Sequence, residues 1–412
     1  MAHSELRQDW RLLSSAGTGI IFSVIVLPYY TIGALVVPVT EAFGWSRAEF
    51  QAAILFSAGL GALTSPLIGY LSNRYGPRRV ALPSMVGLSL GFFIASTIEG
   101  ELWLLYSAYA CMAILGAGTI PVTWTQAITD TFNRQRGLAL GLALTGTGIC
   151  GVLMPQFATY MVAEHGWRAA YIGIGLAPLL IGVPVVFWGF RPHGRTVATT
   201  IEDTPPLSTQ EAPQDGMTLR EAAATSKFWV LLASIFVVYM AASGIGPNLY
   251  PAITDAGMSL SQAATAQSLF GAAVVAGRLM IGYAVDRLWA PGVGAVTMIL
   301  PVIGCLLLVE PSSFLPTAIA AILIGLAAGA ELDLMSYLAS RYFGQKHYAQ
   351  IYSILYMALA ICSGGAPLIF ASIYDSTASY AVSFSIAAGL FALGGLVMLL
   401  LGRYPPEYAV KD

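Results

Sequence analysis

The stretch Ser261–Arg287 reads SQAATAQSLFGAAVVAGRLMIGYAVDR. It is apolar almost throughout and exceeds the roughly 20 residues that an α-helix needs to cross a bilayer. Arg278 lies inside it, about 14 Å from Arg287 at ~1.5 Å per residue, which is close to the middle of a ~30 Å hydrocarbon layer. The stretch therefore predicts a membrane-spanning helix that carries a permanent positive charge near its centre.

The charge of Arg278 needs a partner, because an arginine at the centre of a spanning helix costs at least ~2.5–3.5 kcal/mol and does not lose its proton. At helical spacing its face carries one amide and no large side chain: Gln267, Gly271, Val274, Val275 and Gly282. We interpret this face as the wall of a cavity in which Arg278 binds an anion. The alternative is a buried ion pair with a structural role.

The composition indicates a polytopic membrane protein. Of the 412 residues, 57% are hydrophobic and 10% are charged, whereas soluble domains carry about 25% charged residues. A net charge of −2 gives no basis for a nucleic-acid partner. The cysteines and histidines lack the spacing of a metal site, and the chain has no Walker motif. We therefore expect no metal, no cofactor and no use of ATP.

Hydropathy predicts an all-α membrane protein with twelve transmembrane helices in two six-helix halves. The predicted spans are about 15–38, 50–72, 79–98, 102–128, 136–162, 168–190, 228–252, 261–287, 292–309, 314–340, 348–374 and 380–402. A polar, proline-containing segment between the sixth and seventh spans predicts a mostly disordered linker. The predicted domains are an N-terminal half (1–190), a cytoplasmic linker (191–227) and a C-terminal half (228–412).

The basic residues predict the orientation. Of the 19 Lys and Arg residues, only Arg47 and Arg168 fall on one side of the membrane, and Arg278 falls within it. Because cytoplasmic loops are enriched in Lys and Arg, we expect both termini in the cytoplasm, with the chain a multi-pass protein of the cell (inner) membrane.

The two halves repeat each other. One constant offset matches Gly33 to Gly246, Pro38 to Pro251 and Arg74 to Arg287. Two similar halves in the same orientation form a parallel repeat, which is one of the architectures that transporters use.

The loop Gly69-Tyr-Leu-Ser-Asn-Arg-Tyr-Gly-Pro-Arg-Arg79 is similar to G-x-L-x-D-R-x-G-R-[KR], the hallmark loop of the major facilitator superfamily, and Gly282-Tyr-Ala-Val-Asp-Arg287 repeats it. The resemblance implies a major facilitator fold with a cytoplasmic gate. The gate residues that it implies are Asn73, Arg74, Arg136, Asp286 and Arg287. Asn73 stands where the family usually has Asp, so we expect an asymmetric gate.

A narrower resemblance, over most of the chain, is to the monocarboxylate porters and their oxalate/formate exchanger relatives. It is carried by Glu41-Ala-Phe-Gly-Trp-Ser-Arg47, by Arg134-Gln-Arg-Gly-Leu-Ala-Leu-Gly141 and by Gly277-Arg278. It implies an organic anion bound by arginine. Those carriers often have an acid four residues before this arginine, and mammalian members have a Lys in the first span. Here Val274 replaces the acid and the Lys is absent, so we look elsewhere for the proton-coupling residue.

Two acids in the tenth predicted span are the candidates for coupling. Glu331 and Asp333 lie about 15 and 12 Å from Arg341 along a helix, which matches the depth of Arg278. Two residues are about 200° apart on a helix, so the acids point in different directions. Asp333 shares a polar face with Ser336, Tyr337 and Ser340, whereas the face of Glu331 is apolar: Ala327, Ala328, Leu334, Met335 and Leu338.

We therefore expect Asp333 to face Arg278 in the cavity. An apolar surrounding disfavours a charged carboxylate, so we expect Glu331 to be protonated part of the time. Both acids are predicted to couple transport to protons, and which of them carries the proton stays open. The alternative for each is that it anchors a neighbouring helix.

Uncharged side chains complete the predicted substrate site around Arg278: Tyr29, Tyr30, Trp124, Gln126, Asn248, Tyr352 and Tyr356, with Thr31, Thr123, Tyr239 and Ser243 as further candidates. For each aromatic residue alone, simple packing is the alternative. As a set they suit a small aliphatic or aromatic carboxylate, and one cavity cation favours a monocarboxylate over a dianion.

Two proline pairs and one glycine motif give further predictions about helix bending and helix packing. Pro28 and Pro38 in the first span, with Pro247 and Pro251 in the seventh, predict bends that close an outer gate. The segment Gly146–Gly151 fits GxGxxG, but no strand precedes it, so it predicts close helix packing and not a dinucleotide site.

The sequence thus predicts a secondary active transporter, and no enzyme, that moves a small organic monocarboxylate by alternating access. Arg278 would bind the carboxylate, and Asp333 and Glu331 would couple it to protons. The expected partners are the substrate, protons and the lipid bilayer, with the monomer as the functional unit. The alternatives are an organic anion exchanger or a metabolite or drug exporter of the same fold without proton symport, and, as a third class, a transporter-like sensor without flux or a membrane enzyme.

Overall fold

The computed structural model describes residues 7, 9–132, 136–190, 216–285, 287–344 and 347–404. These residues are almost entirely helical, and the isolated bridge between Gly216 and Gly344 is their β-type pairing. Eight of the helices are long and apolar enough to cross a membrane by themselves. The first and fourth spans are built from shorter helices that follow one another, and the second is one helix of 29 residues.

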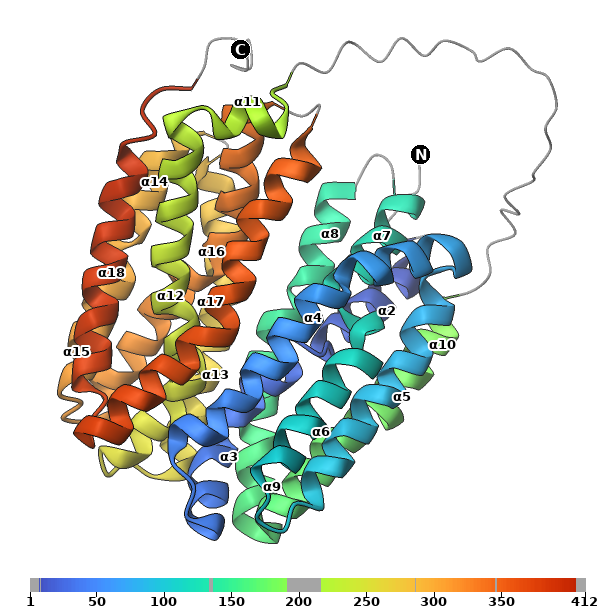
Figure 1. Cartoon of the computed structure of the whole chain (residues 1–412), viewed down its shortest axis with the longest axis vertical. Helices are drawn as coiled ribbons and strands as arrows, with labels where there is room; N and C mark the ends of the chain where they lie inside the picture. The colour runs from blue at the N-terminus through green and yellow to red at the C-terminus, as the bar shows by residue number, and fades with distance from the viewer. Residues whose placement is uncertain are drawn as a thin grey trace.

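The first bundle contains helices α2 to α10 (Figure 1). Its elements are α2 (Trp10–Ile21), α3 (Leu27–Phe43), α4 (Arg47–Tyr75), α5 (Pro77–Ser96), α6 (Leu102–Leu115), η1 (Ala117–Thr119), α7 (Pro121–Thr131), α8 (Arg136–Leu144), α9 (Gly146–Ala177), η2 (Pro178–Gly182) and α10 (Val183–Gly189). Gly166 has φ 81° and turns the chain between the fifth and sixth spans inside α9, a conformation that favours glycine.

The second bundle contains α12 to α18, preceded by the short helix α11. Its elements are α11 (Leu219–Ala223), α12 (Ser226–Asp255), α13 (Leu260–Val285), α14 (Ala290–Thr297), α15 (Ile299–Val309), α16 (Phe314–Phe343), α17 (Tyr348–Thr377) and α18 (Ala381–Leu399). Together the described elements form twelve spans, as the hydropathy predicts.

The structure interrupts the predicted first span and orders part of the predicted linker. The first span is broken at residues 22–26, and Pro28 stands at the start of α3, where a missing N–H costs nothing. By contrast, α12 runs through Pro247 and Pro251 without interruption. The last part of the predicted disordered linker is also ordered, because Thr218 and Glu221 form a capping box on α11. The Met217 N–H donates to the Phe343 carbonyl at 2.8 Å.

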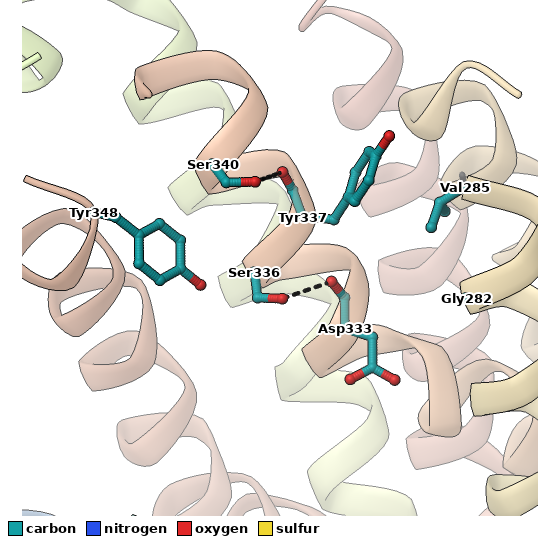
Figure 2. Close-up of a pocket in the computed structure, with 7 residues that line it drawn as sticks. All are labelled: Gly282, Val285, Asp333, Ser336, Tyr337, Ser340 and Tyr348. Atoms are coloured by element: carbon teal, nitrogen blue, oxygen red, sulfur yellow. Dashed lines mark hydrogen bonds between the residues drawn. The ribbon is translucent and has the colours of Figure 1, made fainter. Parts of the chain in front are cut away.

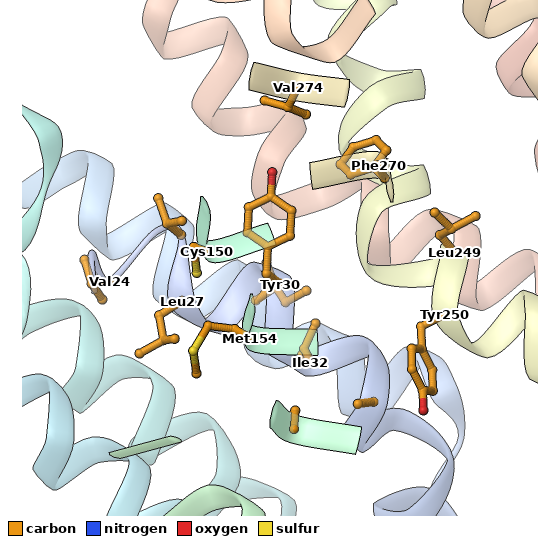
Figure 3. Close-up of a cluster of buried hydrophobic side chains, with 14 of the residues drawn as sticks. Val24, Leu27, Tyr30, Ile32, Cys150, Met154, Leu249, Tyr250, Phe270 and Val274 are labelled. Atoms are coloured by element: carbon orange, nitrogen blue, oxygen red, sulfur yellow. The ribbon is translucent and has the colours of Figure 1, made fainter. Parts of the chain in front are cut away.

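The two bundles touch at one end and diverge toward the other (Figure 1). Here the end that carries Trp10 and Tyr404 is called the terminal end, and the opposite end is called the far end. Toward the far end, hydroxyl and amide groups join the bundles: Thr159 donates to Tyr250 at 2.9 Å and Gln51 donates to Asn248 at 2.6 Å. Tyr30 and its apolar neighbours pack between them (Figure 3).

The predicted close packing at Gly146–Gly151 is present where α9 crosses α13. A Cβ on Gly148 would lie 2.2 Å from Val275 Cγ2, and one on Gly151 would lie 2.9 Å from the Gly271 Cα. These distances leave no room for a side chain, so the small residues bring the bundles together close to Arg278.

Candidate functional site

The contact between α13 and α16 sets the position of Arg278. A Cβ on Gly277 would lie 2.0 Å from the Leu326 carbonyl oxygen, and one on Gly329 would lie 2.1 Å from the Val274 carbonyl oxygen. The two backbones touch there. Arg278, which follows Gly277, and Asp333, one helical turn after Gly329, therefore come into direct contact.

Arg278 and Asp333 form an ion pair, with Arg278 Nε 3.2 Å from Asp333 Oδ2. Arg278 is 8% exposed, whereas the Asp333 side chain is 37% exposed. Asp333 therefore faces Arg278 as the helical spacing predicts. The contact is electrostatic, because Nε makes no hydrogen bond to the described residues.

A second contact ties Arg278 to the other bundle. Its Nη1 donates to the Leu144 carbonyl at 3.0 Å, where α8 ends, and the Thr147 hydroxyl donates to the same oxygen at 2.9 Å. Nε, on the other edge of the guanidinium, faces Asp333 and makes no hydrogen bond to the described residues. This edge of the guanidinium is the fork that a carboxylate can meet with both oxygens.

Asp333 opens onto a pocket of about 480 Å³ between α13, α16 and α17 (Figure 2). Its lining residues are Gly282, Val285, Asp333, Ser336, Tyr337, Ser340 and Tyr348. The polar face predicted for the tenth span thus lines a real opening. Its volume is in the ~300–1,000 Å³ range of small-molecule sites.

Glu331 lies on the opposite face of α16 and is 7% exposed. Its Oε1 is buried and has no hydrogen-bond partner among the described residues. The apolar face expected around it is present, since Leu334, Met335 and Leu338 are all buried. Two tyrosines from the helices opposite, Tyr29 and Tyr239, interact with it electrostatically.

Four of the predicted tyrosines gather around these charges. Tyr30 interacts with Arg278, and its hydroxyl points toward α13 (Figure 3). Tyr352 lies within electrostatic range of Asp333, and both Tyr352 and Tyr356 lie within electrostatic range of Tyr239. Tyr29 packs edge-to-face on Tyr30 with the ring centroids 5.3 Å apart. The aromatic and charged positions therefore form one cluster between the bundles.

Two predicted substrate residues have other surroundings. Trp124 is fully buried in the first bundle, where its Nε1 donates to the Thr119 carbonyl at 2.8 Å. Asn248 is fully buried. Its Oδ1 accepts a hydrogen bond from Gln51 of α4, and its Nδ2 donates to the Gly244 carbonyl. Both amide and indole groups are thus engaged by the protein in this conformation. Gln126 is half-buried on α7.

The structure shows a contact at the far end that the sequence patterns do not predict. The Arg47 guanidinium donates to both carboxylate oxygens of Asp255 at 2.6 and 2.8 Å and to the Tyr380 hydroxyl at 3.1 Å. The Asp375 carboxylate accepts the backbone N–H groups of Arg47 and Ala48 at the start of α4. We call Arg47, Asp255, Asp375 and Tyr380 the far-end latch. Arg47 is one of two basic residues expected on that side of the membrane, which is the signal that could have revealed it.

The comparison with protein families decides the class of the chain. The family model described as "Major Facilitator Superfamily" matches residues 18–291 and 231–412. The chain belongs to the Major Facilitator Superfamily. It is therefore a multi-pass membrane transporter and not an enzyme.

Within the superfamily, the chain is 26% identical over 361 residues to the human "Monocarboxylate transporter 11", covering 83% of this chain and 72% of that protein. It is 25% identical to the "Fujikurins efflux protein" of Gibberella fujikuroi, covering 85% and 72%. A solved bacterial homologue of the lysosomal transporter Spinster, in an inward-facing and unoccupied conformation, superimposes with a TM-score of 0.70. The two share 17% identity over 98% of this chain and 100% of that one.

The hallmark positions of the superfamily are described only in part. Arg74 donates to the Tyr70 hydroxyl at 2.9 Å, and the Arg287 guanidinium lies 3.6 Å from the centroid of the Tyr283 ring. The side chains of Asn73 and Arg136, and all of Asp286, lie outside the described residues. The gate assigned to these five residues stays a prediction.

Proposed function

We propose that this chain is a proton-coupled secondary transporter of a small organic monocarboxylate that works by alternating access. The observation that carries the proposal is the Arg278 guanidinium, 8% exposed at the contact between the bundles, whose Nε faces Asp333 without a hydrogen bond to the described residues. A carboxylate matches this edge of the guanidinium in charge and shape. The tyrosines around it would contact the body of the substrate.

The charge balance of the site supports proton coupling. Arg278 and Asp333 together are neutral when Asp333 is ionised. A substrate carboxylate would add a second negative charge, and an uncompensated charge inside a membrane protein is costly. Uptake of one proton by Asp333 restores neutrality. We therefore assign Asp333 the exchangeable proton and Glu331 a supporting role in the same coupling.

The proposal includes an orientation in the membrane. The distribution of Lys and Arg supports a protein of the cell (inner) membrane with both termini in the cytoplasm. The terminal end is then cytoplasmic, and the conformation described here, latched at the far end, is inward-facing. One chain holds the whole cluster, so we propose the monomer as the functional unit.

A second candidate is an exporter of organic acids without proton symport. The similarity to the fungal protein named for efflux of fujikurins supports it. The two candidates share the anion site at Arg278 and differ in the role of Asp333.

Counterflow in proteoliposomes tests the proposal. Pyruvate and phenylpyruvate are suitable probes, because both acids are almost fully ionised at neutral pH and ions cross lipid slowly. Vesicles loaded with the unlabelled acid should take up the labelled acid. Arg278→Gln should abolish this uptake. Arg168→Gln is the matched control, because Arg168 donates to the Ile98 carbonyl within one bundle.

Three outcomes separate the candidates. Uptake driven by a pH gradient supports symport. Counterflow without such accumulation supports the exporter or exchanger. Equal counterflow by the wild type and Arg278→Gln would contradict the carboxylate site. So would a correctly folded wild type that shows no counterflow with either acid.

A further inference from the structure

Four of the six spans in the first bundle lose regular α-helical geometry part-way along their length. The first span is interrupted between α2 and α3, and the fourth is interrupted between α6 and α7 around η1. The fifth is interrupted between α8 and α9, and the sixth contains the π-helical turn η2. We call these four places the seam: residues 22–26, 116–120, 145 and 178–182. Irregular turns inside helices often mark functional positions.

The parts of the seam lie close to one another. In the first-span break, the Val24 N–H donates at 2.9 Å to the hydroxyl oxygen of Thr119 in the fourth-span break. A Cβ on Gly182 of η2 would lie 3.1 Å from the Phe22 ring. A Cβ on Gly146, at the start of α9, would lie 2.6 Å from a carbonyl oxygen of α2. The irregular turns therefore meet at one level of the bundle.

The helices on the terminal side of the seam pack around α2. Ser15 of α2 donates to the Val185 carbonyl of α10 at 3.0 Å. A Cβ on Gly19 of α2 would lie 2.2 Å from the Trp124 ring of α7, and α8 also contacts α2. Figure 1 shows α2, α7 and α8 on the terminal side of α3, α6 and α9. We call α2, α7, α8 and α10 the terminal layer, and their mutual contacts make it one packed unit.

The second bundle is more regular. Its helices α12, α13, α16 and α17 each run without interruption, and its ninth span is divided at Met298 between α14 and α15. In the first bundle, α4 and α5 are continuous, but α5 contains Pro83 beside the seam. The next residue, Ser84, accepts the Gly118 N–H of the seam at 3.1 Å. Because interrupted helices and proline positions are where helices bend, the first bundle is the one built to change shape.

The seam also meets Arg278 of the second bundle. The Leu144 carbonyl, at the end of α8 and directly before the interruption at Thr145, accepts from Arg278 Nη1 at 3.0 Å. The end of a helix leaves carbonyl groups without a partner in the helix, so the interruption provides an acceptor for the arginine. On its other edge, Arg278 Nε lies 3.2 Å from Asp333. A shift of α8 would therefore pull on the guanidinium that Asp333 holds.

We propose that the seam is a hinge about which the terminal layer tilts as one unit toward the second bundle and closes the terminal end. The second bundle keeps its shape, and α4 and α5 bend, with α5 bending at Pro83. This use of the hinge rests on the alternating access of the proposed function. Because Arg278 donates to the Leu144 carbonyl at the seam, the tilt changes the position of the arginine relative to Asp333. Closure of the terminal end and the state of the anion site are then coupled through one hydrogen bond.

Pulsed electron resonance on the spin-labelled full chain in lipid, without substrate, tests the hinge. Gly33→Trp switches the conformation by steric overlap, because a Cβ on Gly33 would already lie 2.9 Å from the Tyr250 Cβ across the far-end contact. Gly246→Trp is a second wedge, since its Cβ would overlap a tyrosine hydroxyl of α3. Labels at Glu101→Cys and Ala256→Cys, on opposite bundles, identify the wedge that opens the far end.

Two further label pairs compare the bundles in that open variant. Ser14→Cys with Glu101→Cys spans the seam, and Arg220→Cys with Glu310→Cys spans the second bundle; all four positions are exposed. Cys111→Ala is the background, because the other native cysteines are buried. The mean distance across the seam should shift by a few ångströms, since a rotation of ~15° moves the end of a helix ~18 Å long by about 5 Å. The second-bundle distance should stay unchanged.

A second test needs no wedge. Thr119→Val removes the acceptor of the buried Val24 N–H and should broaden the distance distribution across the seam, whereas Thr119→Ser keeps the hydroxyl and should match the wild type. The hinge would be overturned by a constant seam distance when the far end opens, by equal shifts in both bundles, or by a Thr119→Val distribution identical to that of the wild type. Because no substrate is added, these results are independent of the counterflow that tests carboxylate transport.

Discussion

Arg278 is held between a carboxylate of its own bundle and a carbonyl of the other. Asp333 Oδ2 lies 3.2 Å from its Nε, and the Leu144 carbonyl accepts from its Nη1 at 3.0 Å. A substrate carboxylate at Nε and Nη2 would compete with Asp333 for the same positive charge. In the proposed function, substrate binding, protonation of Asp333 and contact between the bundles would therefore be linked at one guanidinium.

This competition predicts the pH dependence of binding. In the wild type, affinity for pyruvate should fall as the pH rises, because more Asp333 is ionised and competes for Arg278. Asp333→Asn cannot ionise, so its affinity should be high and independent of pH, while counterflow continues. Calorimetric titration over a range of pH measures this, with Glu310→Gln, an exposed acid in a connection, as the control. A pH slope retained in Asp333→Asn would exclude Asp333 as the coupling group.

At the scale of elements, the α13–α16 contact supports the site. The helix backbones touch at Gly277 and Gly329, and interfaces between membrane helices favour such small residues because they permit close approach. Separation of these helices would move Arg278 away from Asp333 without changing either residue.

Gly277→Leu should therefore destabilise the protein, because inserted methylene groups in a packed interface cost typically ~1–3 kcal/mol. The control is Gly389→Leu on α18, where a Cβ would have no neighbour within 4 Å. Thermal unfolding in detergent should show a lowered midpoint for Gly277→Leu and an unchanged one for Gly389→Leu. Equal midpoints for both variants would argue against the close contact.

The elements also show what helical periodicity can and cannot predict. It separated the polar face of Asp333 from the apolar face of Glu331, because both faces are set by positions along one helix. It could not predict the break at residues 22–26 or the partners of Trp124 and Asn248, because these depend on other helices. The hydrogen bond from Gln51 to Asn248 joins positions far apart in the chain, and no local sequence pattern predicts such a pairing.

At the scale of the whole molecule, the latch holds the far end closed while the bundles diverge at the terminal end (Figure 1). Arg47 and the start of α4 belong to the first bundle, and Asp255, Asp375 and Tyr380 belong to the second. Opening of the far end must break all these contacts at once. The latch therefore sets part of the free-energy difference between the two conformations.

Arg47→Gln should shift the population toward a state that is open at the far end. Hydrogen bonds to charged groups contribute ~1.5–3 kcal/mol, which corresponds to a shift of roughly tenfold to a hundredfold. Spin labels at Glu101→Cys and Ala256→Cys, on opposite bundles, should report a longer distance by pulsed electron resonance. Arg168→Gln, whose contact stays within one bundle, should leave the distance distribution unchanged. An unaltered distribution in Arg47→Gln would show that the latch does not hold this end closed.

The most direct measurement of the carboxylate site is the equilibrium binding of pyruvate to the purified protein by calorimetry. We predict saturable binding to the wild type and to Arg168→Gln, with affinity reduced roughly tenfold to a hundredfold in Arg278→Gln, because charged hydrogen bonds contribute ~1.5–3 kcal/mol. Equal affinity in the wild type and in a folded Arg278→Gln variant would contradict the assignment of Arg278 as the residue that binds the carboxylate.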